Sequence, residues 1–74
     1  MKVTIKLFAT LRDYNDNEFK LDIKSNTNII SIIESLNIPK EEIAIIMVNG
    51  RSADLDYRLK DKDILALFPP VGGG

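Results

Sequence analysis

The chain lacks two residue types that carry much of protein chemistry, because its 74 residues include no cysteine and no histidine. The absence of cysteine excludes disulfide bonds, thiolate metal sites and cysteine nucleophiles. The absence of histidine removes the commonest general base and the commonest metal ligand. The sequence therefore predicts no metal site and a fold held together by its hydrophobic core alone. Eleven isoleucines indicate that this core is densely aliphatic.

An excess of charge of one sign and long apolar runs are also missing. Ten basic and eleven acidic residues are spread along the chain and give a net charge of −1. This balance favours binding neither to nucleic acid nor to a membrane surface. No run approaches the roughly 18 apolar residues of a spanning helix, and the start MKVTIKLF lacks the apolar stretch of a signal peptide. We expect one soluble domain in the cytoplasm.

Glycine is scarce except at the end of the sequence, where residues 72–74 supply three of the four glycines. They follow Phe68-Pro69-Pro70-Val71, in which two prolines stiffen the chain into an extended path. Ordering glycine costs more conformational entropy than ordering any other residue, so a folded domain gains little from this ending. Residues without a Cβ atom can, however, enter a channel too narrow for side chains. We expect residues 1–68 to form the domain and residues 69–74 to form a flexible tail, with the carboxyl group of Gly74 as the reactive centre.

Alternating polar and apolar residues predict two strands in the first third of the chain. Residues 2–8 alternate strictly, which is typical of a half-buried strand. Phe8 falls on the otherwise polar face of this strand. The segment DYNDN at residues 13–17 is typical of a turn, and alternation resumes over residues 18–24. We expect the two strands to form an antiparallel hairpin.

A helix is predicted next. Ser25-Asn26-Thr27-Asn28 supplies several candidate N-caps, and aliphatic residues then recur at helical spacing up to Leu36. β-branched residues are mediocre helix formers. The capping cluster and the period nevertheless favour a helix over about residues 27–37. Pro39 ends this element, and residues 40–42 are expected to form a short exposed turn.

The rest of the domain reads as further strands. The apolar run at residues 43–48 predicts a strand covered on both faces, and the Asn49-Gly50 pair after it is a strong hairpin signal. Residues 51–59 are irregular, with room for one short edge strand. A charged turn at residues 60–63 leads into a last strand at residues 64–68, which the prolines end. This order suits an α+β architecture, with a mixed sheet packed on one main helix.

Three stretches carry a resemblance to a known family: LFATLRD at residues 7–13, VNGR at 48–51 and LKDKDILALFPPVGGG at 59–74. The chain resembles the ubiquitin-like sulfur carriers of the MoaD/ThiS family, and among them the small subunit of molybdopterin synthase. The ending FPPVGGG is the most specific part of the match. The resemblance implies a ubiquitin-like β-grasp fold. Lys62 stands where the family usually has glycine, which argues against a positive φ at this position.

The resemblance also implies how the tail is used. A ubiquitin-activating-type adenylyltransferase would use ATP to join AMP to the Gly74 carboxyl group, and sulfur would then replace AMP to leave a thiocarboxylate. The tail, with Gly73 beside the reacting group, would enter the large subunit of molybdopterin synthase and donate sulfur for the dithiolene of the molybdenum cofactor. The two subunits would form a heterotetramer. Catalytic side chains would lie on these partners, so the chain would be a non-catalytic carrier with no stably bound cofactor.

Other functions of the same ending stay open. One is the sulfur carrier for thiamine-thiazole synthesis, and another is a ubiquitin-like modifier joined to lysines through Gly74. Pro69-Pro70 favours the molybdopterin carrier, because the thiazole carriers generally lack this pair. A further alternative is a binding module with an incidental tail.

Docking on a partner requires a surface, and the two phenylalanines at strand ends suggest one. If Leu65 and Leu67 face the helix, the other side chains of the last strand point outward beside the tail. An apolar patch of this kind on a small protein usually marks a partner site. The alternative is that the aromatic rings are ordinary core residues. The predicted partner-binding residues are Phe8, Ile64, Ala66, Phe68, Pro69, Pro70, Val71 and Gly72.

Overall fold

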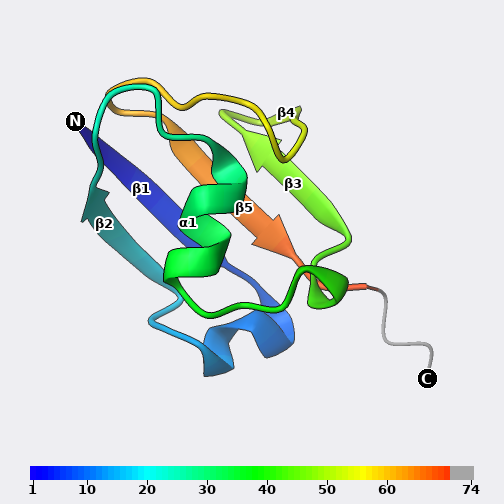
Figure 1. The fold of residues 1–74 in the computed structure, drawn as a ribbon. Coiled ribbons are helices and arrows are strands. Elements are labelled where there is room, and N and C mark those ends of the chain that lie inside the picture. The colour runs from blue at the N-terminus through cyan, green and yellow to red at the C-terminus, as the bar shows by residue number, and fades with distance from the viewer. Residues whose placement is uncertain (71–74) are drawn as a thin grey trace.

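The computed structural model describes residues 1–70, which form a sheet, one α-helix and two short 3₁₀ helices. Figure 1 shows how these elements are arranged. The predicted order of strand, strand, helix, strand, irregular segment and strand is confirmed. In chain order the elements are β1 (Lys2–Leu7), η1 (Ala9–Asp13), β2 (Glu18–Asp22), α1 (Ile29–Ser35), η2 (Lys40–Glu42), β3 (Ile45–Val48), β4 (Arg51–Ser52) and β5 (Ile64–Phe68).

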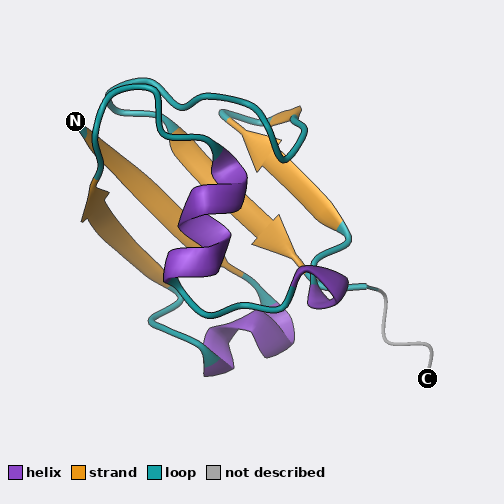
Figure 2. Cartoon of the chain, in the orientation of Figure 1, coloured by secondary structure: helices purple, strands orange, loops and turns teal. Residues whose placement is uncertain are grey.

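The five strands form one mixed sheet in the order β2-β1-β5-β3-β4. The first hairpin is antiparallel as predicted, and β3 pairs antiparallel with both β4 and β5. β1 and β5 are parallel neighbours. Figures 1 and 2 show α1 lying across one face of the sheet, which we call the inner face. The opposite, outer face is covered by no helix from residues 1–70.

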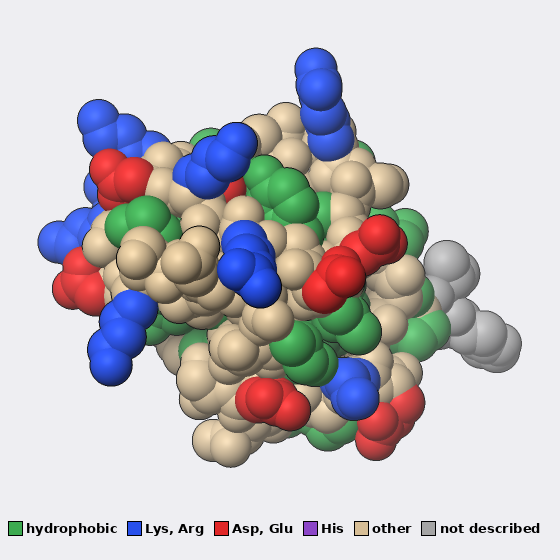
Figure 3. All heavy atoms as spheres, turned by 45° about the horizontal axis from the view of Figure 1, so that its top comes forward, with side chains coloured by type: hydrophobic (Ala, Val, Ile, Leu, Met, Phe, Trp, Pro, Cys, Tyr) green, Lys and Arg blue, Asp and Glu red, His purple; other side chains and the backbone are tan. Residues whose placement is uncertain are grey.

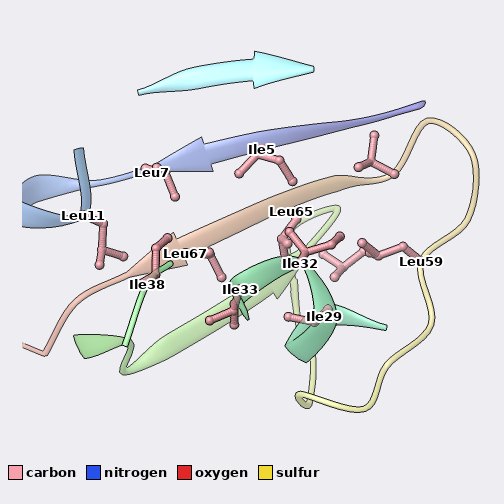
Figure 4. Close-up of a cluster of buried hydrophobic side chains, with 12 residues drawn as sticks. Ile5, Leu7, Leu11, Ile29, Ile32, Ile33, Ile38, Leu59, Leu65 and Leu67 are labelled. Atoms are coloured by element: carbon pink, nitrogen blue, oxygen red, sulfur yellow. The ribbon is translucent and has the colours of Figure 1, made fainter. Parts of the chain in front are cut away.

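The core fills the space between the inner face and α1, and Figure 4 shows side chains from both converging there. Full burial of one such aliphatic side chain stabilises the fold by about 1.5–3 kcal/mol. Leu11 on η1 closes one end of the core with no exposed surface. The dense aliphatic core that the isoleucines predict is therefore present. Its buried residues are Val3, Ile5, Leu7, Leu11, Ile29, Ile32, Ile33, Ile38, Val48, Leu59, Leu65 and Leu67.

Helix α1 is shorter than the predicted span of residues 27–37, because both of its ends are capped. The Asn28 side chain accepts a hydrogen bond from the Ser31 backbone N–H at 3.1 Å, an N-cap that starts the helix at Ile29. At the other end Asn37 has φ 61°, and the Ile38 N–H donates to the Ile33 carbonyl at 3.2 Å. This left-handed ending is a Schellman motif. A helix of seven residues has little stability alone, so packing of its isoleucines holds it.

Two features of the fold differ from the sequence-based expectation. The 3₁₀ helix η1 was not predicted, since five residues are too few to show a hydrophobic period. The prediction that residues 43–48 form a strand covered on both faces is wrong, because Ile45 is 48% exposed whereas Val48 is 5% exposed. Only the inner face of β3 meets the core, so alternate residues of its apolar run remain on the outer face.

The turns around Asn49-Gly50 and Lys62 fix where β5 begins. Asn49 and Gly50 have φ values of 52° and 82°, as a two-residue primed hairpin turn requires. The Asn49 side chain also donates to Asp63 Oδ1 and accepts from the Ile64 N–H, each at 2.9 Å. The expectation that lysine argues against positive φ at position 62 is wrong, since φ there is 71°. The Lys62 N–H donates to the Lys2 carbonyl at 2.6 Å, which holds this conformation.

The molecular surface carries charges of both signs without a large region of one sign on the side that Figure 3 displays. No helix within residues 1–70 is long and apolar enough to cross a membrane. Side chains that bind metals also form no group of three or more in this part of the chain.

Candidate functional site

Strand β5 separates the core from the candidate partner surface. Its alternate residues point to opposite faces of the sheet. Leu65 and Leu67 lie on the inner face and have no exposed surface. Ile64, Ala66 and Phe68 therefore lie on the outer face, and Ile64 is 39% exposed. The condition on which the predicted patch depended, that Leu65 and Leu67 face the helix, is met.

Phe8 and Phe68 stack on each other at the end of β1 and β5. Their ring centroids are 4.4 Å apart and the ring planes differ by 9°. The Phe8 backbone N–H extends the parallel pairing by donating to the Leu67 carbonyl at 3.2 Å. Both rings are half-buried, so neither is an ordinary core residue. The parallel pairing of β1 with β5 thus brings together two aromatic rings that are 60 positions apart in the chain.

Two residues of β3 extend this surface, and the sequence analysis missed them. Ile45 is paired with Phe68 and Met47 with Ala66, and residues directly opposite in an antiparallel pair share one face. Their signal in the sequence is period 2 within the apolar run, which points Ile45 and Met47 away from Val48. We call the whole surface the outer apolar patch. It consists of Phe8, Ile45, Met47, Ile64, Ala66 and Phe68.

The chain leaves the sheet at this patch. The N–H of Ala44, the residue before β3, donates to the Phe68 carbonyl at 2.8 Å, so the last residue of β5 is still fixed to its neighbour in the sheet. Pro69 follows half-buried and Pro70 is exposed. Val71, Gly72, Gly73 and Gly74 lie outside the described residues, and their predicted roles remain predictions.

A contact between the two 3₁₀ helices lies at the same end of the sheet. The Tyr14 hydroxyl, just after η1, donates a hydrogen bond to the Glu42 carboxylate at the end of η2. This bond raises the pKa of Tyr14 above its usual value of 10.0, and partial burial and the negative charge of Glu42 act in the same direction. The contact joins two segments that flank the end of β5 in Figure 1.

The described residues bring no metal-ligand cluster to the patch. The patch itself offers apolar contact and aromatic stacking, and Lys6 of β1 lies beside Ala66 on the same face. Such a surface can bind another protein and can direct the segment that follows Phe68 toward it.

The mixed sheet wrapped across one helix defines a ubiquitin-like β-grasp protein. Within this fold the family can be assigned, because the model of the ThiS family matches residues 5–74. The chain belongs to the ThiS family. No curated protein sequence matches the chain.

Solved structures agree with this assignment. A Pyrococcus furiosus protein assigned as molybdopterin converting factor, subunit 1, is 30% identical with a TM-score of 0.76, over 95% of this chain and 98% of that one. A chain from the complex of subunits 1 and 2 of molybdopterin-converting factor from Helicobacter pylori is 27% identical with a TM-score of 0.66, over 100% of each chain. The small archaeal modifier protein 1 of Methanosarcina acetivorans is 27% identical with a TM-score of 0.75, over 99% of this chain and 95% of that one.

Proposed function

We propose that the chain is a sulfur carrier that serves as the small subunit of molybdopterin synthase. In this function the carboxyl group of Gly74 is adenylated at the expense of ATP by an activating enzyme. A sulfide equivalent then displaces AMP and leaves a thiocarboxylate on Gly74. The large synthase subunit receives the tail and uses this sulfur to build the dithiolene of molybdopterin.

The single observation that carries the proposal is the ending FPPVGGG within a ThiS-family β-grasp domain. The similarity to subunit 1 in the Helicobacter pylori complex supports a large-subunit partner, because that relative is seen together with subunit 2. The outer apolar patch supports the same proposal. It lies where β5 ends, so a protein that covers Phe68 would also be next to the tail.

Protein modification is the second candidate, and the similarity to the small archaeal modifier protein favours it. The same adenylated carboxyl group would then be attacked by a lysine amine and would form an isopeptide bond. The two candidates share their first step and differ in the nucleophile that follows.

The test is the intact mass of the chain after incubation with ATP, sulfide and the adenylating enzyme encoded in the same genome. We expect a mass increase equal to the replacement of one oxygen atom by sulfur, mapped to Gly74 by fragmentation. The mass before incubation must also show that Gly74 is the last residue of the protein made in the cell. The matched control is the chain without Gly73 and Gly74, which should give no shift.

Different results point to different conclusions. Conjugates between Gly74 and lysines, with no thiocarboxylate, would favour the modifier. Full support of molybdopterin formation by the truncated control would disprove the sulfur carrier. Conjugation of the truncated control to lysines would disprove the modifier, because each function requires the carboxyl group of Gly74.

A further inference from the structure

A hollow of about 490 Å³ lies at the opposite end of the outer face from the tail. Because β1 and β5 are parallel, both strands begin at this end, and Thr4 of β1 lies beside Ile64 of β5. The hollow is lined by Lys2, Val3, Thr4, Lys20, Asp61, Lys62 and Ile64. Three ammonium groups and one carboxylate therefore surround it.

The lysines of the hollow differ in how their charge is balanced. On the outer face Lys2 lies opposite Asp22, whereas Lys20 lies opposite Thr4, which has no charge. Asp61 uses one carboxylate oxygen to accept the Lys2 backbone N–H at 2.9 Å. Within residues 1–70 the one ion pair is between Lys6 and Glu18, at 4.0 Å, which leaves Lys20 and Lys62 without a carboxylate at that distance.

The backbone fixes the positions from which both lysines reach the hollow. Lys20 belongs to β2, and its pairing with Thr4 places it on the outer face. Lys62 has φ 71°, and its N–H is bonded to the Lys2 carbonyl. Lys62 therefore lies on the far side of β1 from Lys20, and the hollow lies between them.

The hollow is continuous with the outer apolar patch, because Ile64 belongs to both. From Ile64 to Phe68 the strand advances four residues, or about 13 Å at roughly 3.3 Å per residue. An interface of ordinary size, about 800 Å² on each partner, covers such a length. A protein bound over the whole patch would therefore also cover the rim of the hollow.

Covering Lys20 and Lys62 would remove water from two ammonium groups. This is unfavourable unless each charge meets an opposite charge or a hydrogen-bond acceptor. We propose that the hollow binds an acidic segment of the protein partner that docks on the outer apolar patch, with partner carboxylates between Lys20 and Lys62. The proposal rests on the proposed function, since it concerns the same docking face.

The first experiment compares two double variants that each lose two positive charges. Lys20→Gln/Lys62→Gln empties the hollow of its unbalanced lysines. Arg51→Gln/Arg58→Gln is the matched control, because these exposed arginines do not line the hollow. The probe is the purified large subunit of molybdopterin converting factor from the same genome, and its affinity is measured at low and high salt.

We expect the lysine variant to bind about two- to thirtyfold more weakly than the wild type at low salt, as for the loss of two exposed charge pairs. The difference should shrink at high salt, because screening weakens the same pairs in the wild type. The arginine variant should bind like the wild type. Equal binding by both double variants with tight wild-type binding would overturn this inference alone. No binding by the wild type would overturn the proposed function and the inference with it.

A second measurement needs no partner protein. Hexaglutamate titrated into the ¹⁵N-labelled wild-type chain should shift the amide signals of Thr4, Lys20, Lys62 and Ile64. Inorganic phosphate at matched ionic strength should not shift them. Equal shifts with phosphate would identify a site for small anions and would contradict an acidic protein segment as the occupant.

Discussion

Neighbouring residues of β5 lie on opposite faces of the sheet and differ in burial. Leu65 and Leu67 have no exposed surface and pack in the core, whereas Ile64 of the same strand is 39% exposed. All of these residues are aliphatic, so composition does not separate them. The position of α1 does, because it covers one face and leaves the other free. An apolar residue outside the core of so small a domain is therefore available for contact with another protein.

The outer face itself is also divided. Along β1 and β2 it carries charged residues in cross-strand pairs, such as Lys6 with Glu18. Along β5 and β3 it carries the outer apolar patch. The division separates a region that water solvates well from one that a partner would cover.

The largest expected effect is the loss of stability when a side chain on the inner face of β5 is truncated, compared with one on the outer face. Leu67→Ala should lower the free energy of unfolding by about 2–5 kcal/mol, because it leaves a cavity in the core. Phe68→Ala should lower it by much less, since it removes a half-exposed ring and a stacking contact worth about 0.5–1.5 kcal/mol. Urea unfolding followed by circular dichroism measures both values.

Binding should show the opposite order. Phe68→Ala should weaken the complex with the large subunit by about 2 kcal/mol or more, as truncation of an aromatic anchor does. Leu67→Ala should retain wild-type affinity per folded molecule. If Phe68→Ala binds normally, the outer apolar patch is not the docking surface.

The difference in burial between the faces explains which features could be predicted from the sequence and which could not. The alternation in β5 and the Asn49-Gly50 turn are local signals, and both are confirmed. Burial of a strand that is apolar on both faces is decided by what packs against it. For this reason residues 43–48 were misjudged, and Ile45 was missed as part of the patch. Phe8 and Phe68 were predicted to share one surface, but the stacking of their rings was not, because it depends on the parallel pairing of β1 with β5.

A smaller effect should separate backbone conformation from side-chain burial. Lys62 belongs to neither the core nor the outer apolar patch. Its φ of 71° lies in the left-handed region, which costs a residue other than glycine about 1–2 kcal/mol. Lys62→Gly should therefore raise the free energy of unfolding by about 0.5–1 kcal/mol after glycine's added chain entropy is subtracted. The measurement is the urea midpoint at unchanged slope.

Lys60→Gly is the matched control for this test. It removes a lysine from the same turn at a position that is not among those with positive φ, so it should lower stability. A loss of stability in both variants would mean that the left-handed conformation at Lys62 is not strained.

The smallest expected effect is the pH dependence of stability that arises from the contact between Tyr14 and Glu42, which joins the two 3₁₀ helices. Ionisation of Tyr14 would break the hydrogen bond that its hydroxyl donates to Glu42 and would place a negative charge against that carboxylate, so the pKa of Tyr14 in the folded chain is raised above 10.0. A raised pKa means that the contact contributes its full stability below pH 10 and loses it as the pH rises through the folded pKa. The melting temperature of the wild type should thus fall more steeply above pH 10 than that of Tyr14→Phe, which has no hydroxyl to ionise. Parallel curves for the two proteins between pH 8 and pH 11 would show that this contact does not join η1 to η2 in solution.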